Sequence, residues 1–371
     1  MSPPAVRDAE LFTAGIDDVV VTAVTDAGVE VTTRLGDRTL TTIGPYHVAH
    51  FTDLEPGATY DLAVEGAPLS AWLPAEVTLL TPPPGRLLST FATVNDVHFG
   101  EVECGKIGGP VEVGPVFSVA PGETPYPLVM NRAAVAEIAP FDPHVVVAKG
   151  DLTSEGTEGE YAAFLEVYEG AFGDRLVHVR GNHDGMHAAI ASTAPLAAEI
   201  PGVTLAVLDT VKPGFGEGRL TGDQVGWLDD LAAGADGPVL VFGHHHPWDP
   251  ASTERNADYF GINPDDSEAL VACLGRHANI AGYFAGHTHR NRVRRFAAAR
   301  DIPIVEIACV KDYPGAWAEY RVYEGGYAQI VRRITAPDAL HWTEQTRHMF
   351  VDLYHEYAIG VLADRCFTEP F

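Results

Sequence analysis

The sequence contains little cysteine and little positive charge, and it has no long apolar run. Its four cysteines, Cys104, Cys273, Cys309 and Cys366, lie far apart and form no Cys-x-x-Cys pair. This argues against a disulfide framework and predicts reduced thiols in a cytoplasmic protein. The first residues lack a basic segment followed by an apolar one, so we expect no signal peptide. No apolar stretch approaches the length of a membrane span, so we expect no membrane partner.

Basic residues are scarce relative to acidic ones. The 371 residues include 24 Lys and Arg against 51 Asp and Glu, which gives a net charge of −27. Such a surface repels nucleic acids and anionic membranes, and this argues against both as partners. An anionic substrate would therefore need local positive charge, such as bound metal ions, at its site.

Residues 1–81 are expected to form a small all-β domain. Short runs rich in β-branched and aromatic residues alternate there with Gly, Asp and Pro, at a spacing typical of a β-sandwich. The stretch from Leu54 to Tyr60, Leu-Glu-Pro-Gly-Ala-Thr-Tyr, resembles a corner of fibronectin type III domains. Residues 82–85, Pro-Pro-Pro-Gly, predict a stiff linker, because consecutive prolines keep the chain extended.

After the linker, apolar strands alternate with helices, which predicts an α/β domain over residues 86–371. Residues 99–125 are rich in Gly and Pro without a clear period, and connections of this length are often functional. The C-terminal residues 339–364 have helical spacing. Strands are expected at residues 87–94, 145–148, 176–179, 203–208, 239–242, 280–285, 302–310 and 327–334, with helices at 131–138, 158–172, 223–232 and 267–277.

Five of the predicted strands end in side chains that bind metals or carry protons. In an open α/β sheet the carboxyl ends of the strands border one crevice, so these motifs are expected to converge. Gly-Asn-His-Asp alone could equally be a polar turn. The motifs are Asn-Asp-Val-His at 95–98, Gly-Asp at 150–151, Gly-Asn-His-Asp at 181–184, Gly-His-His-His at 243–246 and Gly-His-Thr-His at 286–289.

The residue types in these motifs indicate transition metals. Asp96 and His98 are two positions apart, so both point to one side of an extended backbone and can chelate an ion. His287 and His289 have the same spacing. Carboxylate, imidazole and amide oxygen together suit Mn, Fe, Co or Zn better than Ca or Mg. None of the motifs contains a thiolate, which argues against a structural zinc site.

The motifs occur in the chain order of the calcineurin-like metallophosphoesterases, and the sequence resembles this family over roughly residues 87–290. The resemblance implies an α/β/β/α sandwich of two stacked sheets between helices, here with a smaller N-terminal all-β sandwich. It also implies two divalent transition metal ions per chain. With all the motifs present in order, a purely structural role for them is disfavoured.

The resemblance also assigns roles to individual residues. In the family, the ligand of the fourth motif lies two residues before a proline, so Pro247 selects His245, with His244 as the alternative. One ion would be held by Asp96, His98 and His289, the other by Asn182, His287 and one histidine from residues 244–246, and Asp151 would bridge the two.

His183 would not bind metal according to the same resemblance. It would stabilise the attacked phosphoryl group or protonate the leaving oxygen, and Asp184 could orient it. The nucleophile would be a hydroxide held between the two ions, which such centres generate at neutral pH. No covalent phospho-enzyme is then needed.

Details of the motifs favour a phosphodiesterase for small molecules. Purple acid phosphatases of the same fold carry Gly-Asp-x-x-Tyr, whereas Ser154 stands at the tyrosine position here. Asp-x-His at 96–98 with His-His-Pro at 245–247 resembles the cyclic-nucleotide and glycerophosphodiester phosphodiesterase branch, in which an N-terminal sandwich is not standard. The alternatives are a phosphomonoesterase, a nuclease, which the acidic charge disfavours, and a non-catalytic scaffold, which the complete ligand set disfavours.

Overall fold

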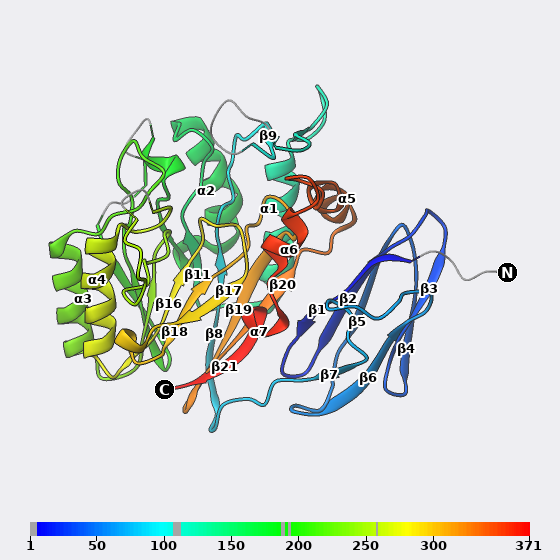
Figure 1. The fold of residues 1–371 in the computed structure, drawn as a ribbon, viewed down its shortest axis with the longest axis horizontal. Helices are drawn as coiled ribbons and strands as arrows, with labels where there is room; N and C mark the ends of the chain where they lie inside the picture. The colour runs from blue at the N-terminus through cyan, green and yellow to red at the C-terminus, as the bar shows by residue number, and fades with distance from the viewer. Residues whose placement is uncertain (1–5, 107–112, 187–189, 192–193, 257–258) are drawn as a thin grey trace.

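The computed structural model describes residues 6–106, 113–186, 190–191, 194–256 and 259–371. An all-β region at the N-terminus packs beside a larger α/β region, and residues 79–86 connect the two (Figure 1). In the described part of the chain, no helix combines the length and the apolar character that crossing a bilayer requires.

The N-terminal region consists of two antiparallel sheets around one apolar core. Val19 and Val21 of one sheet and Leu35 and Leu62 of the other are buried in this core, because alternate side chains of a strand point to the same face. The region is therefore all-β as predicted, and its likeness to fibronectin type III stays a prediction. The first sheet has the order β1 (Arg7–Ala14), β2 (Val19–Val24), β5 (Tyr46–Phe51), and the second the order β4 (Arg38–Ile43), β3 (Glu30–Leu35), β6 (Thr59–Val64), β7 (Glu76–Thr78).

The α/β region contains two six-stranded sheets. Strands β8, β11 and β12 run parallel in the first sheet, and β14, β15, β16 and β18 run parallel in the second. The first sheet has the order β12 (Leu176–Val179), β11 (Val146–Lys149), β8 (Leu87–Val94), β19 (Ala316–Tyr323), β20 (Gly326–Arg333), β21 (Cys366–Pro370); the second has the order β13 (Leu196–Ile200), β14 (Val203–Val207), β15 (Val239–Phe242), β16 (Ile280–Ala285), β18 (Pro303–Glu306), β17 (Arg292–Arg295).

Aromatic side chains join the two sheets face to face. The ring centroids of Phe91 on β8 and Phe242 on β15 are 5.9 Å apart, and those of Phe284 on β16 and Tyr320 on β19 are 5.3 Å apart. Strands in this position are buried on both faces, which explains their nearly continuous apolar sequences. The predicted α/β class with two stacked sheets is confirmed.

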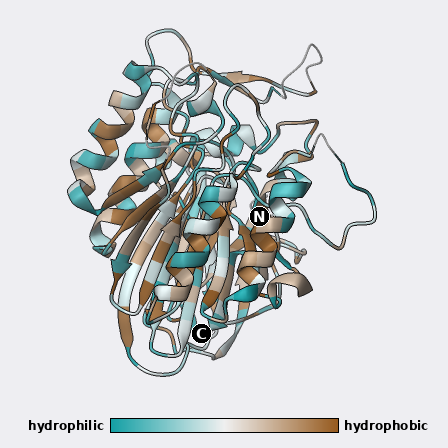
Figure 2. Ribbon diagram, turned by 90° about the vertical axis from the view of Figure 1, so that its left-hand side faces the viewer, coloured by the Kyte–Doolittle hydropathy of each residue, from teal (hydrophilic) through white to brown (hydrophobic). Residues whose placement is uncertain are grey.

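Helices cover the outer faces of both sheets. Met130 of α1 and Phe164 of α2 join the core of the first sheet, and Leu228 of α3 and Leu270 of α4 join that of the second. Hydrophobic and hydrophilic residues lie side by side on these helices, as expected for one buried face (Figure 2). The helices are α1 (Tyr126–Ile138), α2 (Glu158–Phe172), α3 (Gly222–Gly234), α4 (Pro264–Arg276), α5 (Pro337–Thr346), α6 (Tyr354–Ile359) and α7 (Leu362–Arg365).

The C-terminal part of the chain departs from the predicted elements. The predicted strand at 302–310 ends at Glu306, and β19, β17 and β21 were not predicted. β19 lacks a clear apolar pattern because it contains Glu319 and Arg321. Glu319 is buried, and it is bound by the half-buried Arg321 and by Arg332 of β20. Short elements complete the described chain: β9 (Glu103–Cys104), β10 (Phe117–Ser118), η1 (Ala139–Phe141), η2 (Gly173–Arg175), η3 (His183–Gly185) and η4 (Ala297–Ala299).

Strand β1 attaches the N-terminal region to the α/β region. The Thr13 hydroxyl donates to the Val331 carbonyl at 2.8 Å, and the buried Arg365 guanidinium donates to the carbonyls of Leu11 and Phe12 at 2.9 Å. Phe12 itself belongs to the large core of the α/β region. The predicted division at residues 82–85 therefore separates two regions that share a packed interface.

Candidate metal centre

The five motifs follow strands β8, β11, β12, β15 and β16, and they meet where the carboxyl ends of these strands converge. Parallel neighbours bring the motifs together: Val94 of β8 pairs with Ala148 of β11, and Phe242 of β15 pairs with Phe284 of β16. Backbone bonds then tie the motifs to one another, since the Asp96 amide donates to the Gly150 carbonyl at 3.0 Å. The two stacked sheets thus bring all the motifs to one edge.

Five of the predicted metal ligands have left-handed backbone conformations. Their φ angles are 52° for Asp96, 45° for His98, 48° for Asp151, 69° for His287 and 55° for His289. Residues with side chains seldom adopt positive φ, and each such residue costs on the order of 1–3 kcal/mol. These conformations turn the chain sharply at the strand ends and direct the side chains into one small volume.

The first cluster contains Asp96, His98 and His289, whose ligand atoms lie within 4.8 Å of one another. His289 Nε2 is 3.3 Å from Asp96 Oδ1. His98 Nε2 is 3.6 Å from Asp151 Oδ2, so Asp151 lies at the edge of this cluster. Two imidazoles with two carboxylates form a ligand set that suits a divalent transition metal.

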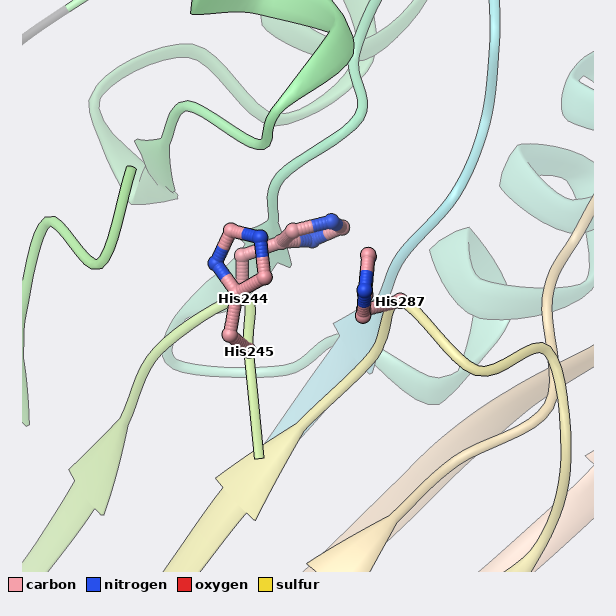
Figure 3. A group of neighbouring side chains, drawn as sticks. All are labelled: His244, His245 and His287. Atoms are coloured by element: carbon pink, nitrogen blue, oxygen red, sulfur yellow. The ribbon is translucent and has the colours of Figure 1, made fainter. Parts of the chain in front are cut away.

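The second cluster forms around His244, His245 and His287, whose ring nitrogens also lie within 4.8 Å (Figure 3). His244 Nε2 is 3.1 Å from Asn182 Oδ1 and 3.3 Å from Asp151 Oδ2. The Asp151 carboxylate is thus close to both clusters. A carboxylate has two oxygens, so Asp151 can contact an ion in each cluster.

His244 and His245 differ in what their ring nitrogens contact. His244 Nδ1 donates to the Lys149 carbonyl at 2.8 Å, which leaves Nε2 facing Asn182 and Asp151. A ligating histidine commonly donates its other N–H to a carbonyl in this way. His245 has both nitrogens occupied by protein groups, with Nδ1 2.9 Å from the Thr210 hydroxyl and Nε2 3.2 Å from the Gly216 carbonyl. The contacts therefore favour the alternative, His244, over the predicted His245.

Some buried polar atoms in the clusters have no hydrogen-bond partner among the described residues. These atoms are Nδ1 and Nε2 of His98 and Nε2 of His287. Burial, followed by the charge of Lys311, holds the pKa of His98 well below its usual range, and burial with the nearby His245 does the same for His287. Neutral imidazoles with free, buried nitrogens are the form that binds metal ions. The donor set thus fits two divalent ions.

A family model described as calcineurin-like phosphoesterase matches residues 89–291, which is more than half of the chain. The chain belongs to this family. Its members use a binuclear metal centre, in agreement with the two clusters around Asp151.

Relatives and a solved structure carry related names. A probable cyclic nucleotide phosphodiesterase of Synechococcus is 27% identical over 154 residues, which cover 40% of this chain and 58% of that protein. A cAMP/cGMP dual specificity phosphodiesterase of Mycobacterium tuberculosis is 32% identical over 161 residues, covering 40% and 49%. The chain thus spans about half the length of the curated relatives that it matches. A dimetal phosphatase from Danio rerio shares the fold, with a TM-score of 0.51, 15% identity and coverage of 67% of this chain and 97% of that chain.

His183 does not belong to the cluster of Asp96, His98 and His289, but one of its ring nitrogens lies within 4.8 Å of ligand atoms of His98 and Asp151. Its backbone amide donates to Asp151 Oδ1 at 2.9 Å, and its ring centroid is 4.6 Å from that of His98. Nδ1 is 2.7 Å from the Ser154 carbonyl. Because a carbonyl only accepts, Nδ1 must carry a proton, and Nε2 remains available in the pocket that His183 lines.

Asp184 braces two of the motif loops. Its carboxylate is fully buried and accepts from the amides of Leu152, Thr153 and Gly181 at 2.7–3.0 Å and from the Thr153 hydroxyl at 2.6 Å. Burial and the charge of Asp151 raise the pKa of Asp184 to about 6. In the described part of the chain, the Ser154 carbonyl rather than Asp184 contacts the His183 ring, so the predicted orienting role of Asp184 is not supported.

The sequence did not lead us to a charged network behind His289. Asp312 Oδ2 is 3.6 Å from His289 Nδ1 and 3.3 Å from Lys311 Nζ, and Lys311 also pairs with Glu101 at 2.7 Å. Asp312 is buried, and the Tyr354 hydroxyl donates to it at 2.5 Å. The sequence does contain a sign of this network. Lys311-Asp312 directly follows the predicted strand at 302–310, just as an aspartate follows other predicted strands that carry site motifs.

A pocket of about 660 Å³ opens beside the two clusters. One part of its lining comes from the centre itself and includes Asp151, His183 and His289. Another part is apolar and comes from the C-terminal residues 349–357, together with Phe260. The pocket therefore offers metal-binding side chains and a hydrophobic surface to the same ligand.

Proposed function

We propose that this protein hydrolyses small-molecule phosphodiesters at a centre of two divalent transition metal ions. The position of Asp151 carries the proposal, since its carboxylate lies 3.6 Å from His98 Nε2 and 3.3 Å from His244 Nε2. One ion would be held by Asp96, His98 and His289 and the other by Asn182, His244 and His287, with Asp151 available to both.

The bound ions would supply a nucleophile from water at neutral pH and bind a phosphoryl oxygen. The chain itself would position the substrate and manage protons. With Nδ1 donating to the Ser154 carbonyl, a protonated His183 can donate from Nε2 to the leaving oxygen or to the phosphoryl group. Asp184 would act indirectly, by holding the loops that carry Asp151 and Asn182.

Two observations favour diesters over monoesters. The relatives that match are named as cyclic nucleotide phosphodiesterases. The pocket also extends from the clusters to an apolar surface, which leaves room for a second ester arm. The acidic chain, with a net charge of −27, argues against a nucleic-acid substrate.

The test compares kcat/KM for bis(4-nitrophenyl) phosphate, 4-nitrophenyl phosphate, cyclic AMP and a glycerophosphodiester on one sample loaded with Mn²⁺. We expect at least one diester to be the best substrate and the Asp151→Asn variant to be inactive. A clear preference for the monoester would overturn the diesterase proposal. Cleavage of plasmid DNA at a comparable rate would point to a nuclease instead.

A further inference from the structure

The apolar wall of the pocket lies outside the segment that matches the family. The family model ends at residue 291, whereas the wall is formed by Met349, Phe350, Leu353, Tyr354 and Tyr357. This C-terminal segment is therefore a feature of this chain that the family match does not explain. We refer to these five side chains as the wall.

Several large apolar side chains of the pocket are exposed to water. Leu353 is 62% exposed and Tyr357 is 44% exposed, and Phe260, from another loop of the same pocket, is 58% exposed. Exposed apolar side chains that gather around one cavity mark a binding surface, because burying them against a ligand is favourable. Their number and proximity indicate a ligand with an apolar part.

The rings of the pocket are suited to a planar group. Tyr354 and Tyr357 are stacked, with centroids 6.2 Å apart and an interplanar angle of 25°. The Phe260 ring lies 4.0 Å from that of His287, so an aromatic surface directly adjoins a metal ligand. The Tyr357 hydroxyl donates to the Thr288 carbonyl at 2.9 Å and fastens the wall to the Gly-His-Thr-His motif.

We propose that the wall binds a planar aromatic group on the non-reacting arm of the phosphodiester, so that it selects substrates such as nucleotide-like or aryl diesters. The proposal rests on the proposed phosphodiesterase function and names its substrate class. A phosphoryl group bound at the two clusters would leave its second arm beside Phe260 and the wall, where aromatic stacking and burial both stabilise it.

The N-terminal region holds the wall in place through Glu10 of β1. The buried Glu10 carboxylate accepts from Arg347 Nη2 at 2.7 Å, from His355 Nε2 at 2.6 Å and from the Tyr313 hydroxyl at 2.9 Å. Arg347 lies two residues before Met349, and His355 lies inside the wall segment. One carboxylate from the N-terminal region therefore fixes both ends of the turn that carries the wall.

The turn inside the wall needs such support. Phe350, Val351 and Asp352 have φ angles of 55°, 53° and 67°, and three consecutive residues in this region are costly for side chains other than glycine. Their conformation persists only where surrounding contacts hold it. Glu10 is thus a positioning residue for the wall, which assigns the N-terminal region a part in substrate selection.

The test uses two diesters with the same leaving group. Bis(4-nitrophenyl) phosphate has an aromatic non-reacting arm, and methyl 4-nitrophenyl phosphate has a methyl group in its place. We expect the ratio of their kcat/KM values to fall by about tenfold in Leu353→Ala, through KM rather than kcat. Leu69→Ala is the matched control, since Leu69 is equally exposed, at 63%, but lies outside the pocket. An unchanged ratio in Leu353→Ala would overturn the proposal.

A binding titration separates this inference from the function on which it rests. We expect the Mn²⁺-loaded protein to bind phenylphosphonate more tightly than methylphosphonate, and Leu353→Ala to reduce that preference. Equal affinities in the wild type would overturn the wall as an aromatic subsite, whatever the activity. Preferential phenyl binding without hydrolysis of any diester would keep the wall and overturn the phosphodiesterase function.

Glu10→Gln tests the positioning role with nearly the same side-chain shape. We expect the aryl-to-methyl ratio to fall as in Leu353→Ala, while the metal content stays at that of the wild type. If Glu10→Gln does not fold, His355→Ala removes one of the same bonds from the partly exposed side of the network. A folded variant of either kind with a wild-type ratio would contradict the positioning role.

Discussion

At the scale of single residues, the contacts of neighbouring histidines distinguish a metal ligand from a structural side chain. His244 directs Nε2 towards Asn182 and Asp151, whereas both nitrogens of His245 are bonded to groups outside the clusters. The sequence could not show which of the two histidines binds metal, because they are adjacent. The only guide was the family's spacing of the ligand two residues before a proline. Ring orientation depends on Thr210 and Gly216, which lie far away in the sequence.

The two histidines should therefore respond differently to substitution. We expect His244→Ala to lose one of the two metal ions, since it removes a ligand of the second cluster. His245→Ala should keep both ions and lose stability instead, because it removes the ring that bonds to the Thr210 hydroxyl and the Gly216 carbonyl. Elemental analysis after removal of loosely bound metal decides between them. A full metal complement in His244→Ala would return the assignment to His245.

His183→Ala should keep its metal ions and lose most of its turnover, because His183 lines the pocket without being one of the proposed ligands. A positioned proton donor contributes about 10²–10⁴-fold to a rate. The loss should be smaller for a nitrophenolate leaving group, which needs little protonation, than for an alkoxide. His178→Ala is a suitable control, since its ring bonds to Tyr161 away from the site. Equal losses for both leaving groups would argue for electrostatic stabilisation instead.

At the scale of elements, the motif loops depend on one another for their shape. Asp184 accepts four hydrogen bonds from the loops after β11 and β12, and those loops carry Asp151 and Asn182. The Gly-Asn-His-Asp sequence revealed that Asp184 belongs to the site. Its bracing role could not be predicted, because it requires the loop after β11 to fold beside it.

Substitution of Asp184 should affect both the loops and the metal centre. In Asp184→Ala the buried amides of Leu152, Thr153 and Gly181 lose their acceptor, and each unsatisfied group costs about 1–3 kcal/mol. We expect a lower free energy of unfolding in urea and weaker metal binding. Thr153→Ser, which keeps a hydroxyl, should show little of either effect. If the Asp184→Ala variant were destabilised but bound metal with normal affinity, Asp184 would stabilise the loops without contributing to metal binding, contrary to this prediction.

The apolar strands that carry the motifs could be predicted, whereas β19, whose charged residues are paired within the fold, could not. The strands that carry the five motifs were all located, because each has a short apolar run that ends directly at its motif. β19 was missed because Glu319 and Arg321 interrupt that pattern, although both are satisfied in the fold. The wall was missed for a similar reason, since its position depends on Glu10, more than 300 residues earlier.

At the scale of the whole molecule, buried ion pairs join the two regions. Besides Glu10, Asp18 lies between β1 and β2 and binds Arg332 of β20, and its Oδ2 is 3.0 Å from His50 Nε2. Burial alone would raise the pKa of Asp18, but His50 and Arg332 together lower it to about 2. Part of the stability of this interface therefore depends on these carboxylates being ionised.

The metal-free protein should lose stability in acid through this interface. Because the folded pKa of Asp18 lies below its unfolded value, its contribution is complete above about pH 4 and is lost as the pH falls towards 2. The expected loss is roughly 2 kcal/mol for this residue. Asp18→Asn should be less stable than the wild type at pH 7 and show a smaller decline below pH 4 in chelator-treated samples. Asp26→Asn, at an exposed pair with Arg7, should behave like the wild type.

The proposed metal centre places two metal ions on either side of Asp151. The most direct measurement is anomalous diffraction at the manganese edge from crystals of the Mn²⁺-loaded protein. We predict two peaks per chain, one bordered by Asp96, His98 and His289 and the other by Asn182, His244 and His287, with the Asp151 carboxylate between them. A single peak under saturating metal, or two peaks that do not both lie beside Asp151, would rule out the proposed two-metal centre.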